Sequence, residues 1–374
     1  MRDNKLTGTL PAEWKACTKI ECLYLDKNQF SGSVPPEWCS MTQLYALYLN
    51  DNKLSGSLPS ALANSSKINK YDISNNSMSG VQKYEKGKTV TPKTPLRTSA
   101  SEVSSPTTTT SSISKTPLSD RELLVLFYNR NNGSNWKTKT NWNSSQPLNK
   151  WYGINTDSAG RVTEIVLRDN KITGSLPVEW KDLTQLIKLD LHGSFYSNDV
   201  ERITGTLPTE WKSLTNMTHL ELNYNAISGS LPREWKSWNK SNKILLSNNQ
   251  LEGSLPPSWK TMVSINEVDL QSNLLTGRLP GEWKQWIVLS TLNIANNNLS
   301  GNLPKAYKVW SKLYYINVRG NSLSGELPTE WKDLKLLKFL LLNDNQFRGV
   351  FPGEYGELPL LYSLFVSNNA NLSG

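Results

Sequence analysis

Residues 167–180 read LRDNKITGSLPVEW, and residues 1–14 read MRDNKLTGTLPAEW, so one phrase occurs twice in a chain of 374 residues. Its glycine returns at a spacing of 24 residues over most of the chain, as from Gly229 to Gly253. Such self-similarity at a fixed period indicates a repeat architecture. The glycines in this frame are Gly8, Gly32, Gly56, Gly80, Gly174, Gly205, Gly229, Gly253, Gly277, Gly301, Gly325 and Gly349.

The full unit reads LxxLxLxxNxLSGxLPxEWxxL, and each part has a physical role. The LxL alternation predicts a short strand with one buried face. The asparagine before the glycine predicts a turn whose side-chain amide satisfies buried backbone groups of the neighbouring coil. The proline cannot continue a ladder of hydrogen bonds, so Gly-x-Leu-Pro turns the chain along the outer side. One coil cannot bury its own apolar edge, so we expect the coils to stack.

This unit resembles the leucine-rich repeat in its 24-residue plant-type form, over roughly four-fifths of the chain. The resemblance implies an α/β-type repeat solenoid, a right-handed superhelix. A parallel β-sheet is expected on its concave face, and irregular or 3-10 structure on its convex side. A small helical N-terminal cap is expected before the second block of repeats.

Most of the tryptophans occupy two fixed positions of the repeat. One group ends the phrase LPxEW, where plant-type repeats usually place leucine, and the other stands three residues later, again at a leucine position. These positions predict a stacked aromatic ladder in the core rather than a ligand platform. The groups are Trp14, Trp38, Trp180, Trp211, Trp235, Trp259, Trp283 and Trp331, and then Trp238, Trp286 and Trp310.

The repeat pattern divides the chain into four segments. Between the two repeat blocks lies a stretch rich in Ser, Thr and Pro, which predicts a disordered, extended linker; an O-glycosylated stalk has the same composition. The segments are a partial repeat block at 1–80, the linker at 81–117, an N-terminal cap at 118–162, and a repeat solenoid at 163–374 that is truncated at its C-terminal end.

The segment before the second block has the marks of a cap. Ser119 with Glu122 forms a capping box at the start of a predicted helix. GSNW and WYG further along resemble the N-terminal cap of plant-type and protist leucine-rich-repeat proteins. In many extracellular relatives, two cysteines stand where this chain has Asn149 and Thr156. The resemblance therefore implies a cap without a disulfide, which weakens the case for secretion.

The first repeat block begins within a repeat, and the second block stops within one. Met1 stands where a leucine is due, and Gly374 comes just before the next Leu-Pro is due. We therefore expect a fragment of a longer product, with a first block that is marginally stable alone. One repeat also carries seven extra residues within GSFYSNDVERI at 193–203, which predicts a loop outside the stack.

The titratable residues give no sign of catalysis, of a cofactor or of a nucleic-acid partner. The net charge is +9, but much of the excess lies in the linker, and Glu and Lys recur in pairs on the repeats. Cys17, Cys22 and Cys39 lack metal-site spacing; free thiols are favoured over a Cys17–Cys39 bridge. His192 and His219 lie near equivalent strands, but a metal site needs more ligands. Eight glycosylation sequons permit secretion without arguing for it.

The candidate binding surface is the concave face, where outward strand residues vary without harming the core. Its middle is polar with acidic points, while its far end is apolar and aromatic. An exposed aromatic cluster is an anchor for a partner protein, unless a missing downstream coil covers it. Tyr71 is expected on or near this face. The predicted partner-binding residues are Tyr24, Tyr48, Asp190, His219, Glu221, Asp269, Asn293, Tyr315, Asn317, Phe339, Leu341 and Phe365.

Repeats with LPxEW also resemble those of kinetoplastid surface antigens and proteophosphoglycan-related proteins. That resemblance implies a non-enzymatic recognition or adhesion protein at a cell surface or outside the cell, with a protein as partner and a glycan as second candidate. Two alternatives stay open: the sensing ectodomain of a membrane receptor such as a receptor kinase, and a cytoplasmic scaffold. Membrane attachment is expected only through segments outside this chain.

Overall fold

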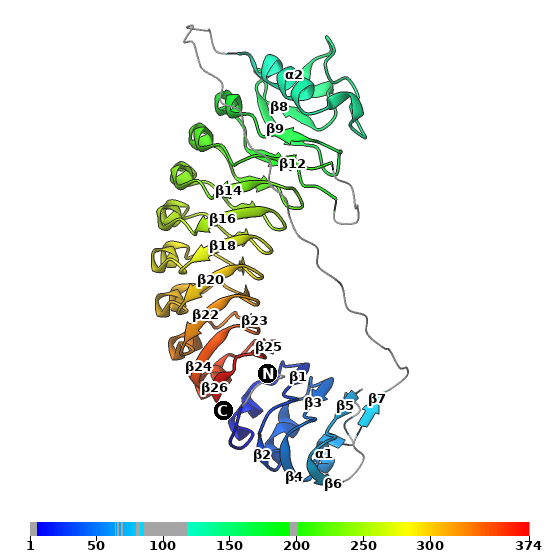
Figure 1. Ribbon diagram of the computed structural model, residues 1–374, viewed down its shortest axis with the longest axis vertical. Coiled ribbons are helices and arrows are strands. Elements are labelled where there is room, and N and C mark those ends of the chain that lie inside the picture. Colours follow the sequence, from blue (N-terminus) through cyan, green and yellow to red (C-terminus); the bar gives the residue numbers. More distant parts are fainter. Residues whose placement is uncertain are drawn as a thin grey trace, which may run out of the picture.

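The computed structural model describes residues 6–63, 65, 67–68, 70–79, 83–85, 118–194 and 201–373. The chain forms a curved stack of coils with strands on its inner side and short helical turns on its outer side (Figure 1). Most of the predicted linker, and the centre of the predicted extra loop at 193–203, lie outside the described residues. The observed architecture is the predicted leucine-rich-repeat solenoid.

The inner strands form one fourteen-stranded sheet, which is parallel except at its two edges, where β8 with β9 and β5 with β7 are antiparallel. From β11 to β25 each coil gives a three-residue strand whose middle side chain is buried, and β9 has five residues. In spatial order the strands are β8 (Ile154–Thr156), β9 (Val162–Val166), β11 (Lys188–Asp190), β13 (His219–Glu221), β15 (Lys243–Leu245), β17 (Glu267–Asp269), β19 (Thr291–Asn293), β21 (Tyr315–Asn317), β23 (Phe339–Leu341), β25 (Ser363–Phe365), β1 (Cys22–Tyr24), β3 (Ala46–Tyr48), β5 (Lys70–Asp72) and β7 (Lys83–Glu85).

The LSG segments of successive coils form three smaller sheets. Gly229 has a φ of 72°, and a Cβ there would meet the Thr206 Cγ2 at 2.9 Å, so close stacking in this segment requires glycine. Their strands are β2 (Ser31–Gly32), β4 (Lys53–Ser57), β6 (Ser77–Ser79), β10 (Gly174–Ser175), β12 (Ile203–Thr204), β14 (Ser228–Ser230), β16 (Gln250–Ser254), β18 (Leu274–Gly277), β20 (Asn298–Gly301), β22 (Ser322–Gly325), β24 (Gln346–Val350) and β26 (Asn371–Ser373).

In most coils a 3-10 turn on the outer side begins directly after the proline of the repeat, whose fixed φ suits a helix start. These turns are η1 (Ala12–Ala16), η2 (Pro36–Ser40), η5 (Val178–Asp182), η6 (Thr209–Ser213), η7 (Arg233–Ser237), η8 (Pro257–Thr261), η9 (Gly281–Gln285), η10 (Lys305–Val309), η11 (Thr329–Asp333) and η12 (Gly353–Glu357). A short helix, α1 (Ser60–Ala63), takes this place in one coil of the first block.

The repeat asparagines bond neighbouring coils to one another. The Asn273 Oδ1 accepts from the Leu251 N–H at 2.9 Å, and its Nδ2 donates to the Leu246 and Leu270 carbonyls at 3.0 Å. One buried amide thus satisfies backbone groups of its own coil and of the preceding coil. The predicted role of the asparagine is confirmed. The same bonds recur at Asn52, Asn76, Asn225, Asn249, Asn297, Asn321, Asn345 and Asn369.

The repeat tryptophans form the predicted core ladder. Trp235 and Trp259 stack with ring centroids 6.3 Å apart and 9° between their planes. The Trp259 Nε1 donates to the Pro232 carbonyl of the preceding coil at 2.9 Å, and this bond recurs along the stack. The ladder residues are buried, so they are not a ligand platform.

The cap closes one end of the stack. Helix α2 (Asp120–Arg130) begins with the predicted capping box of Ser119 and Glu122. Phe127 packs on Trp180, the first ring of the ladder in the second block, with centroids 4.5 Å apart. Two 3-10 turns complete the described cap, η3 (Gly133–Asn135) and η4 (Leu148–Lys150).

The first repeat block stacks on the last coil of the second block and extends the same sheet (Figure 1). Strand β1 runs parallel to β25 with a single register pair, Cys22 beside Ser363, whereas successive coils within a block share three pairs. On the outer side η1 lies against η12, where Trp14 meets Phe351. The two block ends that the sequence leaves open therefore cover each other.

Candidate functional site

The concave strand face presents two columns of side chains. Register pairing aligns the first residues of successive strands in column one and the third residues in column two. Column one contains His219, Tyr315 and Phe339, and column two contains Asp190, Glu221, Asp269, Asn293, Asn317, Leu341, Phe365, Tyr24 and Tyr48. Every residue of the predicted partner-binding set therefore lies on this face.

Two of these residues are less accessible than a binding role suggests. Asp190 is fully buried and Asn317 is 6% exposed. The expectation for Tyr71 is wrong: it is the middle residue of its strand, pairs in register with Leu47, and points into the core with 9% exposure. Its strand reads KYD where β11 reads KLD, so Tyr71 takes the inward middle position that leucine holds in other strands.

Aromatic side chains from both repeat blocks form one continuous group in column two. The Tyr24 ring stacks on Tyr48 at 4.9 Å with 5° between the planes, and on Phe365 at 5.7 Å with 24°. We call Phe365, Tyr24 and Tyr48 the aromatic ridge. The first block thus continues the aromatic cluster on the concave face, because its own aromatics extend the column.

A second aromatic group lies beside the ridge. Phe339 packs between Tyr315, at 5.9 Å, and Tyr362, at 5.4 Å. The Tyr362 hydroxyl donates across the block junction to the Glu21 carboxylate. This bond raises the pKa of Tyr362. The repeat pattern gave no signal for Tyr362, since it precedes the strand and its partner is more than 300 positions away in the sequence.

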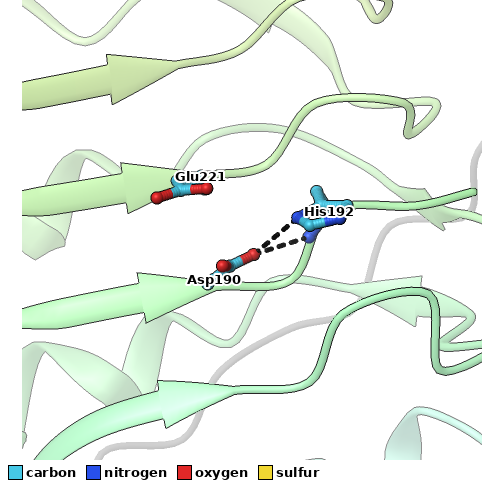
Figure 2. Close-up of side chains that lie close together, drawn as sticks. All are labelled: Asp190, His192 and Glu221. Atoms are coloured by element: carbon cyan, nitrogen blue, oxygen red, sulfur yellow. Dashed lines mark hydrogen bonds and ion pairs between the residues drawn. The ribbon is translucent and has the colours of Figure 1, made fainter. Parts of the chain in front are cut away.

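A polar network lies at the other end of the face. Figure 2 shows Asp190 on its strand, His192 just beyond the strand end and Glu221 on the next strand. The Asp190 Oδ1 meets the His192 Nδ1 at 2.8 Å, and its Oδ2 accepts from the Arg168 Nε at 2.6 Å. Burial alone raises the pKa of Asp190, but the bonds from His192 and Arg168 outweigh it, so the pKa lies below its ordinary value.

The network contains the residue types of a metal site. Atoms of Asp190, His192 and Glu221 that could bind a metal lie within 4.8 Å of one another. However, each carboxylate oxygen of Asp190 already has a partner, and the Arg168 guanidinium supplies the positive charge. The other histidine of the sequence pair, His219, bonds to Thr218 instead, at 2.8 Å. Arg168 and His192 therefore bond to both carboxylate oxygens of Asp190, and the three residues form an ion-pair network.

Arg168 and Asp190 are expected to differ in their effect on stability. Arg168→Ala leaves the fully buried carboxylate with one partner and should lower the free energy of unfolding by about 2–3 kcal/mol. Asp190→Ala leaves Arg168, which is 51% exposed, to be solvated by water, and should cost about 1 kcal/mol. Urea denaturation of both variants measures the difference; equal losses would contradict this description.

The same network predicts a dependence of stability on pH. The pKa of Asp190 is lowered from its ordinary value of 3.8 in the folded chain. Its contribution is therefore fully present above pH 3.8 and is lost as the pH falls through the lower folded-state pKa. Thermal unfolding between pH 5 and 2 should show a smaller loss for Asp190→Asn than for the unchanged chain.

The charges in the middle of the face are largely paired with one another. Lys243 bonds to Glu267 at 2.8 Å, and this bond raises the pKa of Lys243. Burial raises the pKa of Asp269. Because these carboxylates are paired or partly desolvated, they are weak attractors for a cationic ligand. The exposed apolar edge at the ridge is the stronger candidate for partner contact.

Three further features lie away from the concave face. A cleft of 610 Å³ opens at the cap, lined by residues such as Arg121 and Leu148, and contains no predicted site residue. The cysteines are free thiols, with Cys17 buried and Cys39 exposed. In the described part of the chain, no helix has both the length and the apolar character that a membrane span requires.

Comparisons with known proteins agree with this geometry. The model of the leucine-rich repeat matches residues 19–41, 43–65 and 288–309. The leucine-rich-repeat ectodomain of the membrane receptor kinase GASSHO1/SCHENGEN3 from Arabidopsis thaliana, in complex with CASPARIAN STRIP INTEGRITY FACTOR 2, is similar with a TM-score of 0.53 and 27% identity. The match covers 99% of this chain and 38% of that one. The fold and these matches define a leucine-rich-repeat solenoid similar to plant receptor ectodomains.

Two other solved structures share the fold. The PEPR1–AtPEP1 complex has a TM-score of 0.52 at 22% identity, over 100% of this chain and 45% of that one. A plant ice-binding protein has a TM-score of 0.53 at 23% identity, over 68% of this chain and 87% of that one. The chain spans less than half the length of the receptor ectodomains it resembles. No curated protein sequence matches it significantly.

Proposed function

We propose that this solenoid is a non-enzymatic recognition module that binds a protein segment along its concave face, with the aromatic ridge as its anchor. The ridge carries the proposal, because Phe365, Tyr24 and Tyr48 form a half-buried row at the apolar end of the face. Aromatic anchors of this kind dominate binding energy in protein interfaces. The similar receptor ectodomain is also in complex with a partner, CASPARIAN STRIP INTEGRITY FACTOR 2.

The ridge favours a protein partner over a glycan. A sugar ring packs its C–H groups on a free aromatic face, but both faces of Tyr24 are covered, by Phe365 and by Tyr48. What remains accessible is a row of ring edges and hydroxyls. Such a surface suits apolar side chains and the hydrogen-bonding groups of an extended peptide.

A cell-surface or extracellular location is part of the proposal. It is supported by the similarity to a receptor ectodomain. The resemblance of LPxEW repeats to kinetoplastid surface antigens stays a prediction. A sensing ectodomain of a membrane receptor is the second candidate function, favoured by the same similarity over nearly the whole of this chain.

Selection of displayed random peptides against the full chain tests the proposed function. Selected peptides should bind Phe365→Ala and Tyr48→Ala at least tenfold more weakly, which corresponds to about 1.4 kcal/mol. Val263→Ala, at a residue 50% exposed just after η8, is the matched control and should leave affinity unchanged. Peptides that lose affinity with Val263→Ala but not with the ridge variants would overturn the proposal.

A further inference from the structure

We propose that the first repeat block also docks on a second copy of this chain, so that two chains exchange their first blocks reciprocally. The exchanged contact is the one already formed within the chain, where β1 and η1 lie against β25 and η12. Exchange of an identical element needs no new surface, so it is a low-cost route to a dimer. This inference is independent of the proposed peptide binding.

The junction between the blocks is less regular than the contacts between coils inside a block. Trp14 stacks on Trp38 of its own block with 8° between the planes, but it meets Phe351 of the second block at 75°. Repeat tryptophans donate to the proline carbonyl of the preceding coil, as Trp38 does to Pro11. Within the described residues, Trp14 makes no such bond to Pro352.

The junction also contains an internal space. A small apolar cavity of 10 Å³, lined by residues such as Cys17, Leu361 and Leu364, lies between the two blocks. Together with the single register pair between β1 and β25, it indicates that the strand contact at the junction is weaker than the strand contacts between coils within a block. The junction is therefore where the stack opens first.

The connection between the blocks sets how strongly the internal contact is favoured. It starts after Glu85 in β7 and ends at Leu118 before α2, at opposite ends of a sheet with fourteen strands. Thirteen spacings of about 4.8 Å make this span roughly 60 Å. The connecting residues 86–117 number 32 (117 − 86 + 1). Fully extended, they reach roughly 110 Å, so the internal contact is feasible.

The composition of this connection predicts a disordered chain, whose average end-to-end distance is shorter than the span. About 6 Å multiplied by the square root of the residue number gives an end-to-end distance of roughly 34 Å, about half of what is needed. Gaussian chain statistics then give an effective concentration on the order of 0.1 mM for the internal contact. A second copy at comparable concentration competes with it. Crowding on a surface would bring copies into this range.

The exchange also rebuilds the concave face. Phe365 of one chain would meet Tyr24 and Tyr48 of the second copy, so each half of the dimer keeps an aromatic ridge. The Tyr362 hydroxyl would likewise donate to the Glu21 of the second copy. Exchange therefore conserves every contact that the junction makes in the single chain.

A thiol crosslink distinguishes the two forms. Ser363→Cys places a thiol beside Cys22 on the neighbouring strand, at a Cα separation that suits a disulfide. The background carries Cys17→Ala and Cys39→Ser, and oxidation is done near pH 9, because burial and Glu21 raise the pKa of Cys22. At about 2 µM the crosslink should form within one chain, and at about 300 µM a large share should join two chains. A crosslink that stays within one chain at both concentrations, or no crosslink, would overturn the proposal.

The length of the connection supplies a matched pair of variants. Deletion of residues 98–109 leaves 20 connecting residues, which barely reach across roughly 60 Å, so the dimer should form at low micromolar concentration. Insertion of 24 Gly and Ser residues should raise the effective concentration of the internal contact about threefold to tenfold and suppress the dimer. Sedimentation of the unmodified chain and both variants measures this; an association state independent of length refutes the exchange.

Discussion

Trp259→Ala should lower the free energy of unfolding by about 3–5 kcal/mol, one of the largest effects of any single substitution in the chain. Trp259 is fully buried and stacks on Trp235. Its Nε1 donates to the Pro232 carbonyl at 2.9 Å, and in the variant this carbonyl keeps only the longer bond from the Trp235 N–H at 3.3 Å. In addition, its carbonyl accepts from the Trp286 Nε1, so movement of the backbone here disturbs a second ring. Chemical denaturation followed by circular dichroism measures the loss.

Trp259→Tyr and Trp259→Phe separate the ring from its hydrogen bond. The chain itself places tyrosine at this position in two coils, where the hydroxyls of Tyr307 and Tyr355 donate to Pro280 and Pro328. Trp259→Tyr should therefore cost only about 1–2 kcal/mol. Trp259→Phe fills similar space but removes the shorter of the two hydrogen bonds to the Pro232 carbonyl, and should cost about 1 kcal/mol more than tyrosine. If the two variants are equally stable, the hydrogen bond contributes nothing.

Asn273→Ala should destabilise the chain by about 2–4 kcal/mol, although it removes only a small polar side chain. The variant leaves the Leu251 N–H without its partner and removes one bond from each of two carbonyls; the Leu246 carbonyl keeps the Asn249 Nδ2 and the Leu270 carbonyl keeps the Asn297 Nδ2. Each buried group that loses its partner costs about 1–3 kcal/mol. The loss is measured by the same denaturation experiment.

Asn273→Asp tests which half of the amide matters. The aspartate can still accept from the Leu251 N–H, but it cannot donate to the two carbonyls and places a charge in a 6% exposed site. It should be at least as destabilising as alanine near pH 7 and recover partly when protonated. Asn298→Ala, at an exposed asparagine of β20, is the control and should cost less than about 0.5 kcal/mol. Equal losses of stability for the Asn298 and Asn273 variants would contradict the role of the repeat asparagine in bonding neighbouring coils.

The fold could be predicted from the sequence because the period is carried by residues with local roles. Gly229 is needed for its positive φ, Asn273 for its bonds to two coils, and Trp259 for its place in the ladder. Each role repeats in most coils, so a departure in one coil does not hide the pattern that the other coils share. The expectation for Tyr71 was wrong where the local sequence departs from the repeat, because only the strand register shows which side chain points inward.

The contacts between the blocks could not be predicted in this way. Phe365 and Tyr24 are separated by most of the chain, and nothing local to either residue indicates that the coils are neighbours. The network of Asp190, His192 and Arg168 left a weak signal, since an acidic strand residue and a histidine stand two positions apart. Its third member comes from the preceding coil and is visible only once the coils are stacked.

The central claim is that two separated repeat blocks form one solenoid with a single concave face. Small-angle X-ray scattering of the full chain at about 20 µM, below the range in which exchange is expected, tests it most directly. We expect a curve described by one continuous arc, with both blocks in the arrangement of Figure 1. A curve that requires two separate bodies joined by a tether would contradict it.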